Sequence, residues 1–164
     1  MKAAIVFSAL NEAINISEVI EKSKCYGEVI VVDDGSSDAT VSTSDNCGAT
    51  VVKHPINLGQ GVAVLTGFKV ALDGGYDVII EMDADGQHDP HEIPKLVQPI
   101  VENRHDFVIG ARSIDRRNMP LIKRFSEFSN LSISPALWLV MPSYVCSEPV
   151  VGPLLVKKAV SFFR

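Results

Sequence analysis

The stretch DVIIEMDADGQH, residues 77–88, says most about the fold. Its first half carries an apolar run that is typical of a strand buried within a parallel sheet. Two aspartates, Asp83 and Asp85, follow this strand directly. In open α/β sheets, ligands bind beyond the carboxyl ends of the strands. The stretch therefore predicts a buried strand with a polar site at its end.

The same pattern of an apolar run followed by a helical segment recurs through residue 111. Apolar runs predict strands at 3–7, 28–32, 49–53, 77–82 and 105–111. Helical spacing predicts helices at 12–24, 37–46, 60–72 and 90–102. In the third helix, Val64, Phe68 and Leu72 form the expected buried stripe. Alternating strands and helices predict an α/β fold with a mainly parallel sheet and helices on both faces. Residues 112–164 are less regular, and we expect one domain over residues 1–164.

Composition narrows the class of protein. The chain has 164 residues, of which 46% are hydrophobic and 21% charged, as in an ordinary soluble globular domain. Lys and Arg number 15 against 20 Asp and Glu, a net charge of −5. An acidic chain lacks the basic footprint that nucleic-acid binding requires, so we expect no nucleic-acid partner. An anionic substrate would need positive charge at its binding site, such as a bound cation, to offset this net negative charge.

The sequence also bears on the compartment. Three cysteines lie far apart without a CxxC pair, which favours a reducing compartment, and the N-terminal residues read as a strand rather than a signal peptide. The apolar segment 131–141 is too short to span a membrane. It could contact a bilayer surface, although a buried segment is favoured. We therefore expect a cytoplasmic protein, either free or at the cytoplasmic face of the membrane. The sequence leaves open whether the protein forms a homodimer.

Asp83 and Asp85 are the sharpest candidate for a metal site. Alternate residues at the end of a strand project to the same side, and two unpaired carboxylates there would repel each other. Mg²⁺ or Mn²⁺ resolves this conflict, because these cations prefer oxygen ligands and often bind one or two carboxylates together with substrate phosphates. Gln87 supplies a further oxygen, whereas His88 is favoured as a supporting residue.

Two other polar clusters follow predicted strands. Asp33 and Asp34 can accept hydrogen bonds from a nucleobase imide or a ribose hydroxyl, and Gly35 permits a tight turn. The segment 57–61 contains Gly-x-Gly before a helix, but Val64 stands where a dinucleotide fingerprint requires Gly or Ala. These glycines either let the backbone approach a ligand or shape a turn.

Four ordered motifs carry a family resemblance. VVDDGSSDAT (31–40), NLGQGVAVLTGFKVAL (57–72), EMDADGQHDPHEIPKL (81–96) and VIGAR (108–112) resemble inverting family 2 glycosyltransferases of the GT-A fold, especially the dolichyl-phosphate mannosyltransferase-like members. The resemblance implies a nucleotide-sugar-binding half at 1–111 and an acceptor-side segment at 112–164. That segment is shorter than the family's, so a C-terminal truncation is expected.

The resemblance also implies roles for individual residues. The implied nucleotide-sugar-binding residues are Ala9, Asn11, Glu12, Asp33, Asp34, Gly61, Asp83, Arg112, Lys123 and Arg124. The implied metal ligands are Asp83, Asp85 and Gln87, and the implied catalytic residues are Asp85, Arg112 and Glu148. Ser8 stands where the family often has Pro, Gln60 where it often has Lys or Arg, and Leu154 where it has Arg.

The expected function is transfer of a sugar, with inversion, from a nucleotide-diphosphate sugar. A cation and Arg112 would stabilise the negative charge that develops on the leaving diphosphate. An alcohol of a glycan acceptor would need a general base, for which Glu148 is the candidate. A polyprenyl phosphate is already ionised and needs little help, so this acceptor is favoured. The alternative is a nucleotide-sugar-binding module without catalysis.

Overall fold

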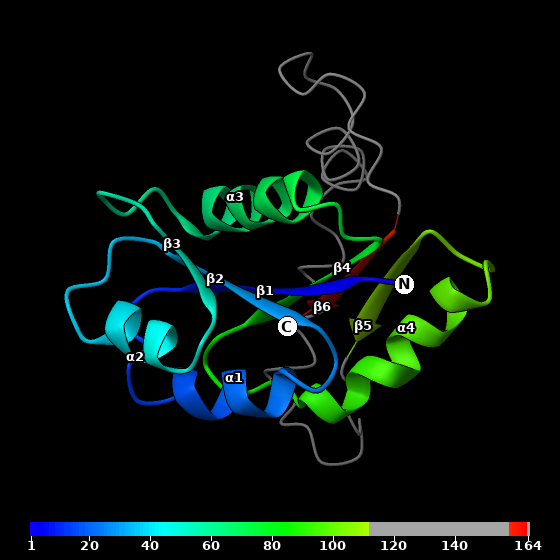
Figure 1. The fold of residues 1–164 in the computed structure, drawn as a ribbon, viewed down its shortest axis with the longest axis horizontal. Coiled ribbons are helices and arrows are strands. Elements are labelled where there is room, and N and C mark those ends of the chain that lie inside the picture. The colour runs from blue at the N-terminus through cyan, green and yellow to red at the C-terminus, as the bar shows by residue number, and fades with distance from the viewer. Residues whose placement is uncertain (112–157, 164) are drawn as a thin grey trace, which may run out of the picture. The chain divides into compact units, whose positions relative to one another are not determined.

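One mainly apolar sheet organises the part of the chain that the computed structural model describes, residues 1–111 and 158–163. Its strands run in the order β3-β2-β1-β4-β6-β5, and all neighbouring pairs are parallel (Figure 1). The strands are β1 (Ala3–Ala9), β2 (Glu28–Asp33), β3 (Thr50–Lys53), β4 (Val78–Asp83), β5 (Phe107–Ala111) and β6 (Ala159–Phe163). The helices are α1 (Ile16–Ser23), α2 (Thr40–Asn46), α3 (Gln60–Asp73) and α4 (Ile93–Val101), with a 3₁₀ turn η1 (Pro90–Glu92) before α4.

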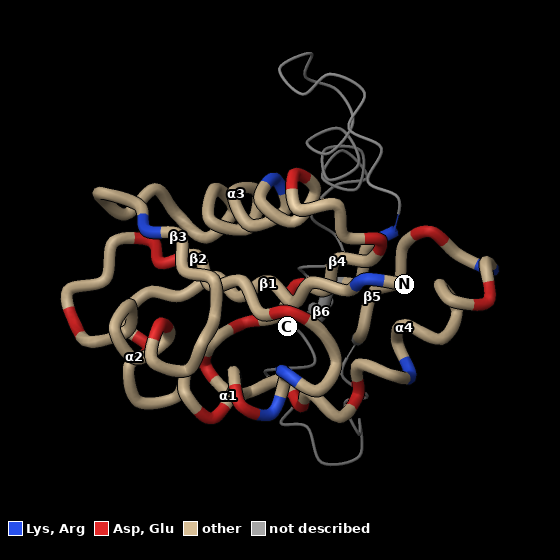
Figure 2. The backbone as a smooth tube through the Cα atoms, in the orientation of Figure 1, with Lys and Arg blue, Asp and Glu red and all other residues tan. Residues whose placement is uncertain are grey.

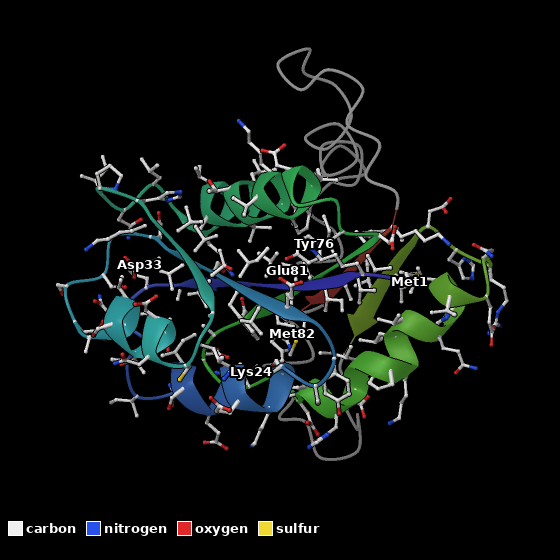
Figure 3. The ribbon with its side chains drawn as sticks, in the orientation of Figure 1. Met1, Lys24, Asp33, Tyr76, Glu81 and Met82 are labelled. Carbon is white, nitrogen blue, oxygen red and sulfur yellow. The ribbon has the colours of Figure 1, made fainter. Side chains whose placement is uncertain are left out.

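Helices cover both faces of the sheet, as the sequence predicts. Figure 1 shows α3 on one face and α1, α2 and α4 on the other. Ile5 and Phe7 of β1 pack in the core on the α1 face, whereas Val6 between them packs in the core on the α3 face. The same alternation is visible in β4, where Glu81 and Met82 point to opposite faces (Figure 3). Continuous apolar runs are therefore strands because both of their faces are buried.

The third helix packs closely against the sheet through small residues. Its buried positions are Ala63, Gly67 and Ala71. A Cβ atom placed on Gly67 would lie 2.2 Å from Cγ1 of Val6, so only glycine permits this approach. The predicted stripe of larger residues, Val64, Phe68 and Leu72, lies beside this contact and is only half-buried.

Several elements differ from the sequence-based expectation. The helix predicted at 37–46 begins at Thr40, and the helix predicted at 90–102 is the turn η1 followed by α4. The first helix begins at Ile16 rather than at residue 12, because Asn11 has a φ of +57° and the N–H groups of Asn15 and Ile16 close a turn on the carbonyl of Glu12. Strand β6 is not predicted from the sequence. It pairs with both β4 and β5, which precede it by many residues.

Within residues 1–111 and 158–163, no helix is long and apolar enough to cross a bilayer. The apolar segment 131–141 lies outside the described residues.

Candidate active site

The carboxyl ends of three strands bring the predicted acidic motifs to one edge of the sheet. Ala9 of β1 is in register with Asp33 of β2, and Ser8 of β1 is in register with Asp83 of β4. Because β1 lies between β2 and β4, Asp33 and Asp83 flank the end of the same strand. On the outer side of β2, Asp33 is in register with Lys53 of β3. Figure 2 shows the acidic end of β2 beside this basic end of β3.

Alternation along the strands assigns the aspartates to different faces. Met82 packs in the core on the α1 face, so Asp83, the next residue, projects to the α3 face. Val31 packs in the core on the α1 face, so Asp33, two residues later, projects to that face as well. Asp33 and Asp83 thus approach the end of β1 from opposite faces of the sheet.

Asp34 is the hub of the α3 face of this edge. The residue is buried, at 3% exposure, and its side chain makes three hydrogen bonds to the segment that connects β3 to α3. Oδ1 lies 2.7 Å from Nδ1 of His54 and accepts the N–H of Leu58 at 2.9 Å. Oδ2 accepts the N–H of Gly59 at 2.7 Å. The carboxylate therefore fixes both ends of the 54–59 loop.

Electrostatics agree with an ionised Asp34. Burial by itself raises the pKa of this carboxyl, but the hydrogen bonds from His54 and from the N–H groups of Leu58 and Gly59 outweigh burial and lower the pKa below 3.8. Nε2 of His54 lies 3.1 Å from Oγ1 of Thr66 in α3, so the imidazole joins the carboxylate to the helix.

The start of α3 connects this hub to Asp83. Gly59 precedes the helix with a φ of +95°, a conformation that favours glycine. Gln60, the first helical residue, donates from Nε2 to Oδ1 of Asp83 at 2.7 Å. Oδ2 of Asp83 lies 3.3 Å from Nε2 of the buried His88. Asp83 is thus held on both oxygens, and His88 contacts it as a supporting residue.

Asp85 and Gln87 sit in the turn that follows β4. Oδ1 of Asp85 accepts the N–H of Gln87 at 2.9 Å, and Gly86 between them has a φ of +74°. Asp85 is half-buried and Gln87 is exposed. The turn therefore presents a carboxylate and an amide close in sequence to the end of the strand.

The side-chain groups at this edge that could act as metal ligands suit a hard divalent cation. They are two carboxylates and one side-chain amide, and oxygen donors of this kind suit Mg²⁺ or Mn²⁺. In the described ranges, no group of three or more His, Cys, Asp and Glu side chains is placed to hold a metal ion. Such a cation would therefore need the Gln87 amide and further oxygens, and substrate phosphates are the usual source of these.

The loops after β1 and β2 form a second cluster on the α1 face. The backbone N–H of Asn11 donates to Oγ of Ser36 at 2.8 Å, and Oδ1 of Asn11 accepts the N–H of Ser37 at 2.9 Å. The N–H of Glu12 donates to Oγ1 of Thr40 at 2.9 Å. We call residues 11–12 and 36–40, joined by these bonds, the loop clasp. It brings the predicted nucleotide-binding residues Asn11 and Glu12 against the loop that follows Asp33.

Asp33 lies beneath the loop clasp and is completely buried, at 0% exposure. Its Oδ2 accepts the N–H of Ser36 at 3.1 Å. Its Oδ1 has no hydrogen-bond partner within the described part of the chain. Ala9, in register with it, is buried, and the Ala9 carbonyl accepts the N–H of Asp34. A buried carboxylate oxygen of this kind is costly unless a donor reaches it.

The remaining predicted residues divide into two groups. Gly61 lies in the first turn of α3 and is exposed, and a Cβ atom placed on it would have no neighbour within 4 Å. The backbone conformation that favours glycine is found at Gly59 instead, which has a φ of +95°. Arg112, Lys123, Arg124 and Glu148 lie outside the described residues.

Sequence reasoning assigns no role to three residues that build the site. His54 and Thr66 hold Asp34 against α3, and Gln60 holds Asp83. A signal for His54 is present, since it follows the strand next to β2 and must therefore lie near Asp34. The partner of Gln60 depends on how α3 crosses the sheet, which no local pattern reveals.

The fold and the site define a parallel α/β protein with acidic residues at the carboxyl ends of its strands, and comparisons with known proteins give its family. The family model "Glycosyl transferase family 2" matches residues 4–146. The chain belongs to glycosyl transferase family 2.

Curated relatives extend this result. The chain is 40% identical over 129 residues to the uncharacterised protein MJ1222 of Methanocaldococcus jannaschii, covering 76% of this chain and 53% of the relative. It is 32% identical over 163 residues to the UDP-N-acetylglucosamine–dolichyl-phosphate N-acetylglucosaminyltransferase of Methanococcus voltae, covering 86% of this chain and 64% of the relative. An undecaprenyl-phosphate mannosyltransferase of Micrococcus luteus is 39% identical over 92 residues, covering 53% of this chain and 37% of the relative. The chain thus spans about half the length of the curated relatives it matches.

Solved structures support the fold. Glucosyl-3-phosphoglycerate synthase of Mycobacterium tuberculosis, in complex with Mn²⁺, UDP-glucose and phosphoglyceric acid, matches with a TM-score of 0.58 and 26% identity, over 71% of this chain and 45% of that one. Mannosyl-3-phosphoglycerate synthase of Rubrobacter xylanophilus shares the fold, with a TM-score of 0.60 over 76% of this chain and 44% of that one, at 18% identity. The predicted GT-A fold, with its parallel sheet between helices, is confirmed.

Proposed function

We propose that this chain carries the donor site of a metal-dependent, inverting glycosyltransferase that moves a sugar from a nucleotide-diphosphate sugar to a polyprenyl phosphate. The observation that carries the proposal is the edge where Asp33 and Asp83 flank the end of β1. One motif lies under the loop clasp, and the other lies beside a turn rich in oxygen donors. We assign the nucleoside to the Asp33 environment and the diphosphate to the Asp83 environment, at the carboxyl ends of the two strands that pair with β1.

The diphosphate half of the site is built from Asp83, Asp85 and Gln87. These residues would hold Mg²⁺ or Mn²⁺, whose charge stabilises the diphosphate as the anomeric bond breaks. This role is supported by the oxygen-only donor set and by the Mn²⁺ and Mg²⁺ complexes of a structural neighbour. It also explains how a chain of net charge −5 accommodates an anionic donor.

The nucleoside half is built from Ala9, Asn11, Glu12, Asp33 and Asp34. Oδ1 of Asp33 is the acceptor for a nucleobase or ribose donor, because no described group uses that oxygen. Asp34 would contribute indirectly by holding the 54–59 loop, because its oxygens already accept hydrogen bonds from His54, Leu58 and Gly59. Because Asp33 is completely buried beneath the loop clasp, the clasp would have to move for the nucleoside to reach it.

The acceptor side follows from chemistry and from the relatives. Two relatives are named for dolichyl phosphate and undecaprenyl phosphate. A phosphate of this kind is ionised at neutral pH and attacks without a general base, whereas a glycan hydroxyl would require Glu148. Arg112, Lys123 and Arg124 are the predicted cationic groups for the donor and acceptor phosphates. A lipid acceptor would put the reaction at a membrane surface, and the cytoplasmic face is the location that we propose.

The test is calorimetry with UDP-, GDP- and CDP-sugars, with and without Mn²⁺, followed by a product assay with a polyprenyl phosphate. We expect one donor to bind only with the cation and the product to have the inverted anomeric configuration by NMR. Donor binding without transfer or hydrolysis would instead identify a nucleotide-sugar-binding module. Donor binding that ignores Mn²⁺ would contradict the metal-dependent scheme.

A further inference from the structure

Gln60 links the two acidic motifs of the candidate site. It is the first residue of α3, and its Nε2 donates to Oδ1 of Asp83 at 2.7 Å. The residue before it, Gly59, is held by Oδ2 of Asp34 at 2.7 Å. A continuous path of hydrogen bonds and backbone thus runs from Asp34 at the end of β2 to Asp83 at the end of β4.

The bond from Gln60 leaves Asp83 able to bind a cation. A carboxylate has about four lone-pair positions on its two oxygens. Gln60 uses one on Oδ1, and His88 approaches Oδ2 at 3.3 Å. Each oxygen therefore keeps acceptor capacity, while the orientation of the carboxylate is fixed by two partners.

The charge of Gln60 matters as much as its position. An amide donates a hydrogen bond without adding charge, so the full negative charge of Asp83 remains for a cation. A lysine, which the family often has at this position, would form an ion pair with Asp83 and so compete with a divalent cation for its charge.

We propose that Gln60 is a positioning residue that sets the affinity of Asp83 for a divalent cation. This inference rests on the proposed function, in which Asp83 holds the metal.

A side-chain amide on the surface of a helix can also contribute only to the stability of the fold. The chain offers a matched control for that structural role. Gln98 is an exposed residue of α4, and its Nε2 donates to Oε1 of Glu102 at 2.9 Å. Gln60 and Gln98 thus make the same kind of bond, amide to carboxylate, from an exposed helical position. Only Gln60 makes it at the candidate metal site.

The experiment titrates Mn²⁺ into the purified chain by electron paramagnetic resonance, alone and with UDP, GDP or CDP. The variants are Gln60→Ala, Gln60→Lys, Gln98→Ala and Gln98→Lys. We expect about tenfold weaker Mn²⁺ binding for Gln60→Ala, because the Asp83 carboxylate would no longer be held in one orientation before the cation binds. Gln60→Lys should bind Mn²⁺ more weakly still, and both Gln98 variants should match the wild type. Thermal unfolding without Mn²⁺ checks that all four variants are folded.

The outcomes separate the inference from the proposed function. If the wild type binds Mn²⁺ and both Gln60 variants bind it equally well, Gln60 has no positioning role and the proposed function stands. Tighter binding by Gln60→Lys would overturn the inference in the same way. If the wild type binds no Mn²⁺ under any of these conditions, both proposals are overturned.

Discussion

His54 and Asp34 form a buried pair in which Nδ1 of the imidazole lies 2.7 Å from Oδ1 of the carboxylate. The two residues follow β3 and β2, which are neighbours in the sheet. Because Asp34 also holds Leu58 and Gly59, this pair fixes the loop that starts α3. The position of Gln60, and through it the orientation of Asp83, thus depends on a contact between the ends of β2 and β3.

Asp34 makes stability depend on pH. Its pKa in the folded chain is lower than the ordinary value of 3.8, so it stabilises the fold above that pH. This contribution should decrease as the pH falls below about 3.8 and should be lost once the pH passes the folded-state pKa. Urea unfolding between pH 6 and pH 2.5 measures it.

Asp34→Asn should remove that pH dependence and lower the free energy of unfolding at pH 6 by about 3 kcal/mol, since an amide nitrogen would face donors that need an acceptor. Asp45→Asn, at an exposed position of α2, is the control and should change little. An unaltered pH profile for Asp34→Asn would show that the buried pair does not carry this effect.

Two glycines of α3 should respond to alanine in opposite ways. Gly67→Ala should destabilise the fold by about 1–3 kcal/mol, because its Cβ would overlap the side chain of Val6. Gly61→Ala should stabilise it by about 0.5–1 kcal/mol, since no atom lies within 4 Å of the added carbon and alanine favours a helix. Chemical denaturation of both variants tests this, and similar values for the two would contradict the packing described here.

Asn11 combines an unusual backbone conformation with the bonds of the loop clasp. Its φ is +57°, and its side chain accepts the N–H of Ser37. Asn11→Ala should cost about 2 kcal/mol of stability, because both the bond and the tolerance for this φ are lost. Asn11→Gly keeps the tolerance and should cost about 1 kcal/mol.

Donor binding by the two Asn11 variants tests the loop clasp itself. If the clasp forms part of the nucleoside site, both variants should bind the donor more weakly than the wild type. Unchanged donor affinity in both would separate the clasp from the nucleoside site.

The sequence predicts the strands of residues 1–111 well because each contains an apolar run, and β1, β2 and β4 are buried on both faces. It places Asp33 and Asp83 at strand ends for the same reason, and the register of β1 then brings them together. It misplaces the start of the first helix, because a positive φ at Asn11 is not visible in the residue pattern.

Other features depend on contacts between distant parts of the chain. Strand β6 is stabilised by pairing with β4 and β5, so its short local sequence is not decisive. Helical spacing assigns the buried stripe of α3 to its larger residues, whereas close packing selects Gly67. The bond between Gln60 and Asp83 arises only once α3 crosses the sheet.

The proposed metal site at the end of β4 is tested by measuring how Mn²⁺ changes the affinity for a nucleoside diphosphate in Asp83→Asn and Asp85→Asn. Asp73→Asn, at the exposed end of α3, is the control. We expect Mn²⁺ to strengthen binding in the wild type and the control, and either site variant to lose at least about tenfold, or about 1.4 kcal/mol. An equal effect of Mn²⁺ on all four proteins would contradict a metal held by Asp83 and Asp85.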